Sequence, residues 1–366
     1  MVSNRDISVD ILRGIAVLTM IAPNLAASVL VEPHPFLLRV YGSFAAPLFT
    51  LISGMMVVLT SRARAHGLRY FMVRGGMLVA VGALIDILIW NIYPFTTFDV
   101  LYLIGISLPI SYLFLRLNSS IRWIAIILIF ALTPILQTVL GYTAYPTEIN
   151  LLGQQTVVVV DETGIFNHWL VDGWFPVFPW LAFSLLGVNL GELRWSQQRD
   201  SHAMHSLGSN LIFLVGVAVL SIGAILWWLY PGSLLTRAGY SELFYPPTTG
   251  YAITAIGVII IFFSIVDRRP SFSGYRPLRV LGEFSLLIYI LHLALIEYII
   301  NLVWGQVDLQ TFLLIYVALS VFIVLIAYWF RKMKDSAKHR HSIVRFLLAG
   351  WQGNVNNLNG SYHHLM

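Results

Sequence analysis

The sequence predicts an all-α fold, a polytopic membrane helix bundle of about ten transmembrane helices with both termini in the cytoplasm. Of its 366 residues, 58% are hydrophobic and only 11% are charged, and the mean hydropathy is +0.79. A soluble domain carries roughly a quarter charged residues and about half apolar ones. A soluble enzyme, a disordered chain and a secreted disulfide scaffold are therefore excluded. The chain has no cysteine, which also excludes thiolate metal sites and a cysteine nucleophile.

Ten apolar runs are long enough, or nearly long enough, to cross a membrane. A helix needs about 20 mostly apolar residues to span a hydrocarbon core of about 30 Å. The runs are continuously apolar rather than alternating, which favours helices over a closed barrel. In chain order they are 14–31, 43–60, 75–92, 100–115, 121–140, 174–191, 208–230, 250–266, 281–303 and 309–330.

The Lys and Arg residues predict the orientation of these spans. With the N-terminus in the cytoplasm, all of them except Arg39 and Arg237 fall in cytoplasmic segments. Such an excess is typical of the cytoplasmic side, so it supports both the even span count and the cytoplasmic termini. The leader contains Asp6 and Asp10, unlike the purely basic start of a signal peptide, and we expect the first run to be retained.

The chain divides into a transmembrane domain over 1–330 and a basic cytoplasmic tail over 331–366. The tail mixes Lys and Arg with scattered apolar residues, a composition suited to the anionic inner leaflet. Two long outer connections, 141–173 and 231–248, are interpreted either as linkers or as caps over an outward-facing pocket. No internal repeat is found, which weakens the case for a transporter built from inverted halves.

Several polar residues fall within or beside the predicted spans, where they are energetically expensive and therefore candidates for function. Asp10 and Arg13 are three residues apart on one helix face, and we expect them to pair. Asn24 lies about 16 Å further along the axis. It belongs either to a site or to a contact between helices. His292 in the ninth run has the same two interpretations, and Asp99 also suits a helix N-cap.

His34 lies in the short outer connection between the first two runs, flanked by Pro33 and Pro35. An imidazole can accept a proton from an amine or a hydroxyl at neutral pH. A lone loop histidine usually has no function, but Asn24 and the small residues that open the next run favour the rim of a cavity. No phosphate-binding glycine loop, nucleophile elbow or zinc motif occurs, so we expect no metal and no nucleic-acid partner.

Short motifs follow one another in a fixed order along most of residues 5–300. The most specific one begins at Asp172 and runs to Trp180. Together the motifs resemble the heparan-alpha-glucosaminide N-acetyltransferase family and its bacterial relatives. The segments that carry this resemblance are Ser8–Ala16, Met20–Asn24, Ala46–Phe49, Ser53–Gly54, Phe98–Leu101, Ile104–Gly105, Asp172–Trp180, Leu186–Gly187, Tyr245–Thr248 and Leu281–His292.

The resemblance implies transfer of an acetyl group from cytosolic acetyl-CoA, across the membrane, to a sugar amine. The family's catalytic pair, an Asn in the first span and a His in the following outer loop, maps onto Asn24 and His34. His34 would act as general base, and Asn24 would donate a hydrogen bond to the oxyanion. The second span carries Ser43 and Phe44 where an acidic residue is expected. Bacterial relatives mostly have no heparan to modify, so the acceptor is left open as a sugar amine or hydroxyl.

The phosphates of acetyl-CoA require cationic partners, and arginine suits bidentate phosphate contacts. The positive-inside rule alone explains any single one of these arginines. The candidate ligands from the predicted cytoplasmic loops are Arg62, Arg64, Arg69, Arg74, Arg268 and Arg269. Further candidate site residues are Asp10, Arg13, Asp99, Asp172 and His292.

A second class of function explains the polar groups within the membrane equally well. A transporter or flippase of a cell-envelope precursor also needs them, and it remains the alternative. An O-acyltransferase differs from the first hypothesis only in its acceptor. The expected partners are acyl-CoA, an extracytoplasmic glycan or amino sugar and the lipid bilayer. The expected location is a bacterial inner (plasma) membrane, and a homodimer is left open.

Overall fold

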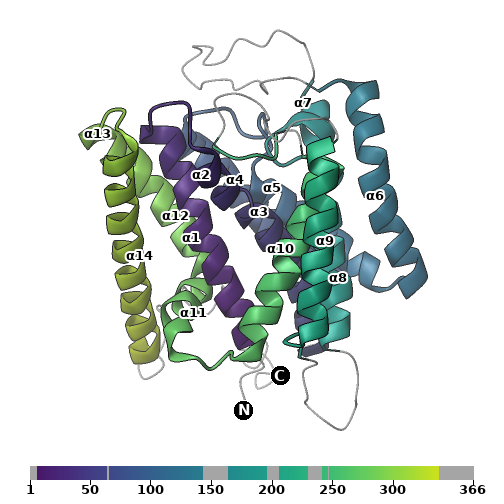
Figure 1. The fold of residues 1–366 in the computed structure, drawn as a ribbon. Coiled ribbons are helices and arrows are strands. Elements are labelled where there is room, and N and C mark those ends of the chain that lie inside the picture. Colours follow the sequence, from purple (N-terminus) through teal and green to yellow (C-terminus); the bar gives the residue numbers. More distant parts are fainter. Residues whose placement is uncertain are drawn as a thin grey trace, which may run out of the picture.

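The computed structural model describes residues 6–63, 66–142, 164–195, 206–229, 241–245 and 247–337. Every regular element in these ranges is a helix, which confirms the all-α membrane bundle, and a single isolated bridge joins Leu30 to Val307. The described chain begins with α1 and ends with α14 at the same end of the bundle (Figure 1). The elements are α1 Ile7–Val29, α2 Phe36–Gly42, α3 Ala45–Ala63, α4 Leu68–Ile85, η1 Asp86–Trp90, α5 Val100–Leu115, α6 Ser119–Leu140, α7 Ile165–Asn167, η2 His168–Asp172, α8 Val177–Arg194, α9 Asn210–Leu229, α10 Thr249–Arg268, η3 Ser273–Tyr275, α11 Arg276–Glu283, α12 Ser285–Leu295, η4 Ile296–Ile300, α13 Asn301–Val303 and α14 Leu309–Ala337.

All ten predicted runs fall on helices in the described part of the chain. Eight helical segments are long and apolar enough to cross a membrane. A ninth forms if Ile165–Asp172 and Val177–Arg194, bent by 51° at the break between them, are taken as one span. The run at 100–115 becomes α5, whose 16 residues fall short of the about 20 that a full span requires. Most of the connections 141–173 and 231–248, and the tail from 338, lie outside the described residues.

The second span begins earlier than the sequence predicts. Residues 36–42 form α2 rather than part of a loop, and α2 and α3 together make one candidate span, Phe36–Arg62. Arg39 interrupts the apolar pattern here, so hydropathy alone places the start at 43. The structure accommodates Arg39 inside the helix because its side chain is buried and donates to the backbone carbonyl of Glu242 at 2.9 Å.

The centre of the bundle is held by direct backbone contact between helices. A Cβ placed on Gly54 of α3 would lie 1.8 Å from the carbonyl oxygen of Ser184 in α8. One placed on Gly187 of α8 would lie 1.9 Å from the carbonyl oxygen of Leu51. Small residues let helices approach this closely in a membrane, where packing rather than hydrophobic burial drives association. α3 and α8 therefore form a closely packed pair.

α1 is fixed to α11 in the same way. A Cβ on Gly14 would lie 1.9 Å from the carbonyl oxygen of Leu278, and one on Gly282 would lie 1.8 Å from that of Asp10. These contacts place the start of α12 directly beside the lower half of α1. They therefore determine which side chains of α12 lie opposite which side chains of α1.

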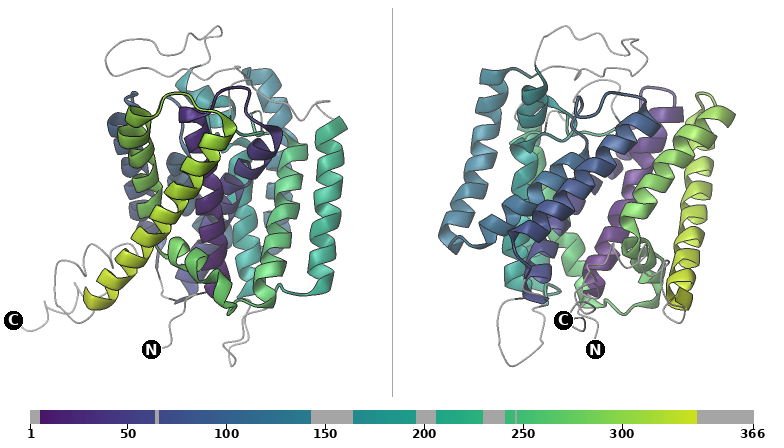
Figure 2. Two further views of the ribbon diagram at one scale, coloured as in Figure 1. Left: turned by 60° about the vertical axis from the view of Figure 1, so that its left-hand side comes forward. Right: turned by 180° about the vertical axis from the view of Figure 1, so that it is seen from behind.

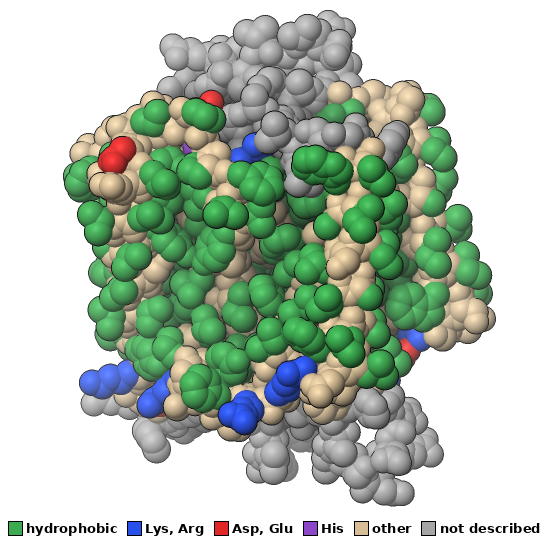
Figure 3. Space-filling model, in the orientation of Figure 1, with side chains coloured by type: hydrophobic (Ala, Val, Ile, Leu, Met, Phe, Trp, Pro, Cys, Tyr) green, Lys and Arg blue, Asp and Glu red, His purple; other side chains and the backbone are tan. Residues whose placement is uncertain are grey.

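The outer helices present hydrophobic side chains to their surroundings. α6 and α14 stand on opposite sides of the bundle (Figure 2), and Val139 and Leu314 on them are 74% and 73% exposed. The surface is largely hydrophobic along its middle, whereas Lys and Arg gather at the end where α1 begins (Figure 3). This distribution agrees with a multi-pass membrane protein, and we refer to the two ends as the basic end and the opposite end.

Candidate active site

Asn24 contacts His292, across the interface between α1 and α12. Its side-chain Nδ2 lies 3.0 Å from Nε2 of the fully buried His292. The other ring nitrogen, Nδ1, lies 3.0 Å from the backbone carbonyl of Ile288. Because a carbonyl can only accept, Nδ1 carries the proton and Nε2 accepts from the Asn24 amide. His292 therefore fixes which way the Asn24 amide faces, and one N–H of that amide is left for another acceptor.

The same cluster extends to α5 through Tyr289. The Tyr289 ring packs edge-on against that of His292, with centroids 5.6 Å apart. Its hydroxyl donates to the buried carboxylate of Asp99 at 2.9 Å. Asp99 stands at the N-cap position of α5, as the sequence predicts, but its side chain makes no capping hydrogen bond there. Asn24, Asp99, Tyr289 and His292 together form what we call the mid-bundle polar cluster.

His34 is attached to a different part of the molecule. Its Nε2 lies 3.2 Å from the carbonyl oxygen of Leu30, and its Nδ1 lies 3.1 Å from the hydroxyl of Ser241. The carbonyl requires the proton on Nε2, so Nδ1 accepts from Ser241. Among the described contacts, none joins His34 to Asn24. The two members of the predicted catalytic pair thus lie close in the chain without touching.

The segment that carries Ser241 is anchored to Ser43 at the end of α2, a residue that α10 also contacts. The backbone N–H of Leu243 donates to the Ser43 hydroxyl at 2.8 Å, and the Tyr251 hydroxyl donates to the Ser43 carbonyl at 2.5 Å. Burial raises the pKa of Glu242 to about 7, and the positive charge of Arg39 acts in the opposite direction. Ser241 was not predicted from the sequence, although Arg39, one of two arginines on the predicted outer side, indicated that a polar partner lies nearby.

Asp172 lies in η2 at the opposite end and is fully buried. Its carboxylate accepts from Nδ1 of His168 at 2.8 Å and from the side-chain amide of Asn167 at 3.1 Å. This Asp–His contact was not predicted, although the spacing of four residues could have indicated it. It orients the His168 ring and is separate from the mid-bundle polar cluster among the described contacts.

At the basic end, Asp10 and Arg13 pair at 3.3 Å, as their spacing predicts. Arg13 also reaches the carbonyl oxygen of Gly282 at 3.4 Å, which is the glycine that touches α1. The pair therefore supports the α1–α11 contact.

The arginines predicted to bind acetyl-CoA lie at the basic end, but no two of them contact the same partner among the described residues. Arg62 is 3.6 Å from Glu192, and Arg74 donates to the Tyr70 hydroxyl at 3.0 Å. Arg268 stacks on Phe213, with its guanidinium 5.2 Å from the ring centroid. The remaining two, Arg69 and Arg269, are exposed. Arg64 lies outside the described residues.

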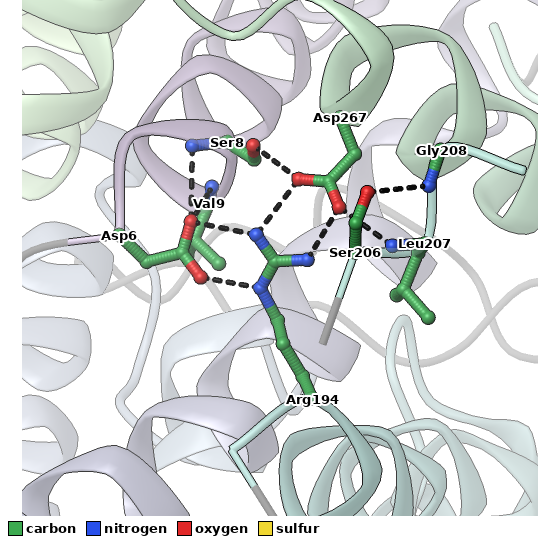
Figure 4. Close-up of polar contacts among 8 residues, drawn as sticks. All are labelled: Asp6, Ser8, Val9, Arg194, Ser206, Leu207, Gly208 and Asp267. Carbon is green, nitrogen blue, oxygen red and sulfur yellow. Dashed lines mark hydrogen bonds and ion pairs between the residues drawn. The ribbon is translucent and has the colours of Figure 1, made fainter. Parts of the chain in front are cut away.

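A buried ion-pair network at the same end was not predicted. Figure 4 shows the guanidinium of Arg194, at the end of α8, between the carboxylates of Asp6 and Asp267. Its contacts with Asp267 measure 2.8 and 2.9 Å, and it makes two hydrogen bonds to Asp6. Asp267 also accepts from the Ser8 hydroxyl at 2.6 Å and from the Leu207 N–H at 2.7 Å. We call Asp6, Arg194 and Asp267 the basic-end clamp, because it ties α1, α8 and α10 together.

The fold and these sites define a multi-pass helical membrane protein with a polar cluster inside the bundle. The model of the family described as heparan-alpha-glucosaminide N-acetyltransferase, catalytic, matches residues 5–230. This stretch is more than half of the 366-residue chain, and the chain therefore belongs to this family of membrane acetyltransferases. The matched residues include Asn24 and His34 and end before α12, which carries His292. No curated protein matches closely enough to serve as a relative.

Proposed function

We propose that the protein transfers an acetyl group from cytosolic acetyl-CoA to an amine or a hydroxyl of a sugar outside the cytoplasm. The observation that carries this proposal is the family match over 5–230, which includes both Asn24 and His34. The concentration of Lys and Arg at one end supports cytoplasmic placement of that end. A bacterial inner membrane is the location proposed with it.

In the proposed reaction, His34 accepts the proton of the sugar acceptor. Its Nδ1 already accepts a hydrogen bond from the Ser241 hydroxyl. An acceptor hydroxyl or amine that replaces Ser241 there would donate to the same nitrogen. As the acceptor oxygen or nitrogen bonds to the thioester carbonyl carbon, its proton passes to His34, the C–S bond breaks, and CoA leaves as a thiolate that takes up a proton.

Asn24 is proposed to stabilise the tetrahedral oxyanion with the N–H that His292 does not use. The contact of His292 with the other N–H supports this, because it holds the amide in one orientation. His292 itself is the less suitable base. It is fully buried, and the lone pair of its Nε2 is directed at Asn24.

The exposed arginines at the basic end are proposed to bind the phosphates of CoA. Arg62, Arg69, Arg268 and Arg269 are the accessible candidates, and Arg64 belongs to the same connection. Guanidinium groups bind phosphate through paired hydrogen bonds. The alternative function, transport of an envelope precursor, predicts no need for CoA at this end.

The test is release of CoA by the purified protein in lipid nanodiscs, with acetyl-CoA and glucosamine as substrates. The chain has no cysteine, so a thiol reagent reports released CoA without a protein background. We expect CoA release that depends on glucosamine, together with acetylated sugar by mass spectrometry. Absence of both, with intact binding of a precursor lipid, would favour the transporter. Radiolabelled acetyl retained on denatured wild-type protein, and lost in His34→Ala, would indicate a covalent acetyl-protein intermediate that depends on His34.

A further inference from the structure

A groove opens sideways from the bundle at the end where His34 lies. It has a volume of about 570 Å³ and lies between α2, α9 and α10, with Phe36, Val40, Ala224, Trp228 and Thr254 among its lining residues. Hydrophobic side chains cover this face of the molecule (Figure 3). Ala224 and Trp228 on α9 are exposed, so the groove is open to the surrounding lipid rather than to water.

A second cavity continues the groove towards the basic end. It measures about 210 Å³, shares Val40 and Phe44 with the first, and reaches Ile15 and Leu278. On α10, Thr254 and Val258 line the groove and Phe262 lines the second cavity. The eight positions from Thr254 to Phe262 correspond to about 12 Å along the helix axis, which is less than half of a hydrocarbon core about 30 Å thick.

The lining is almost wholly apolar, although the buried indole N–H of Trp227 has no hydrogen-bond partner among the described residues. The hydroxyl of Thr254 donates to the carbonyl of Gly250 at 2.8 Å within its own helix, and that of Thr19 donates to Ile15 at 3.1 Å. The hydroxyl of Tyr41 lies 2.8 Å from that of Tyr316. A sugar, or another group with several hydrogen bonds to water, would lose nearly all of those bonds on entering the groove. The groove therefore selects for hydrocarbon.

The groove lies close to the candidate acceptor site along the chain. Phe36, one of its lining residues, is the first residue of α2 and follows His34 by two positions. Val40, one turn further along α2, lines both cavities. A chain lying in the groove therefore has its upper end beside the loop that carries His34.

We propose that this groove holds the hydrocarbon chain of a lipid-linked acceptor, whose amino sugar then lies at His34. The inference rests on the proposed function and narrows it, since it makes the acceptor a membrane lipid rather than a soluble glycan. The chain anchors the sugar at the level of the outer leaflet, so the acceptor reaches the site by lateral diffusion. Binding of the chain contributes to affinity without touching the reacting atoms.

The experiment compares acceptors that differ only in chain length: methyl, octyl and dodecyl glucosaminide, each with acetyl-CoA and protein in nanodiscs. Ala224→Phe fills the groove from an exposed position on α9. Ala131→Phe makes the same change at an exposed position on α6, away from the groove. Long chains partition into lipid whatever the protein does, so the comparison between the two variants is the decisive one.

We expect Ala224→Phe to lower kcat/KM for dodecyl glucosaminide by about tenfold or more, since loss of each buried methylene weakens binding severalfold. Methyl glucosaminide should react at an unchanged rate, and Ala131→Phe should alter neither. Val258→Phe, from α10, should repeat the result. Equal effects on both acceptors, or none, would overturn the proposal, as would conversion of a dimer to a monomer by Ala224→Phe. Failure of the wild type with every acceptor would instead reject the acetyltransferase function.

Discussion

Two histidines occupy different environments, and single substitutions separate their roles. His34 contacts a loop hydroxyl and is partly exposed, whereas His292 is fully buried and contacts the amide of Asn24. A group that exchanges protons with a substrate must be reachable, and a group that orients another need not be. The expected consequences of replacing them therefore differ in kind.

His34→Ala should reduce turnover by about 10²- to 10⁴-fold, because a positioned general base typically contributes that much. The stability of the protein should change little, since the side chain fills no core volume. Turnover is measured by CoA release at matched levels of monodisperse protein. Ser241→Ala serves as the control: it removes the partner of Nδ1 but leaves the imidazole, so most activity should survive. A His34→Ala protein that works at nearly the wild-type rate would refute this assignment.

Asn24→Ala should reduce turnover by about 10²- to 10³-fold, the usual loss for one oxyanion donor. If His292 acts only through Asn24, the double variant with His292→Ala should be no slower than Asn24→Ala alone, since coupled residues are not additive. His292→Gln should be more active than His292→Ala, because the side-chain carbonyl of glutamine can accept a hydrogen bond from the Asn24 amide. Independent, additive losses would instead give His292 a role of its own in the reaction.

At the scale of elements, the basic-end clamp joins three helices that the chain separates widely. Its members come from the start of α1, the end of α8 and the end of α10. The Arg194 side chain is only 3% exposed and that of Asp267 only 5%. Water therefore cannot replace the missing partner when one of them is removed. The clamp fixes the end of α10 that carries Arg268.

Arg194→Leu should destabilise the protein by about 3 to 5 kcal/mol, because it leaves two carboxylates buried without their counter-charge. The measurement is thermal unfolding of monodisperse protein in detergent, over a denaturant series. Arg269→Leu removes an exposed arginine two residues after Asp267. It should change the free energy of unfolding by no more than about 0.5 kcal/mol. Equal losses for the two variants would show that the clamp adds nothing to stability.

Sequence patterns predict the features that depend on neighbouring residues, but not the contacts between residues that are far apart in the chain. The ten apolar runs all lie on helices, and spacing predicts the Asp10–Arg13 pair, because both depend on neighbours in the chain. The contact between Asn24 and His292 joins residues 268 positions apart, and nothing in either segment specifies the other. α2 was missed for a related reason: Arg39 breaks its apolar pattern, and its partner lies in another segment. Tertiary contacts decide these cases.

At the scale of the whole molecule, the distribution of charge predicts the topology. A tag at the C-terminus should be protected from protease in intact cells, and one inserted within 143–163 should be cleaved. The reason is that all but two Lys and Arg residues lie on one predicted side. Labelling of single cysteines, introduced into a chain that has none, provides an independent check. An accessible C-terminal tag would reverse the assignment of donor and acceptor to the two ends.

Neutralising Arg62, Arg64, Arg69 and Arg74 together should weaken binding of acetyl-CoA and make the remaining affinity less sensitive to salt. Ionic strength screens exposed charges over a Debye length of about 10 Å at 0.1 M. Titration calorimetry at two salt concentrations measures both effects. Neutralising Arg116 and Lys332, which are exposed elsewhere at the basic end, controls for the general effect of lost positive charge. An unchanged affinity would direct attention to Arg268 and Arg269.

The tight seating of α1 has a mechanical consequence. Asp6 is held in the clamp, Gly14 lies against the backbone of α11, and Asn24 is bonded to α12. Because these three contacts lie at different levels along α1, the helix cannot tilt to expose the site first to one side of the membrane and then to the other. From its first turn to Asn24 it measures about 25 Å. In the proposed reaction the site therefore does not move. The flexible arm of acetyl-CoA spans the distance from the basic end to Asn24, so the length of α1 sets the length that this arm must have.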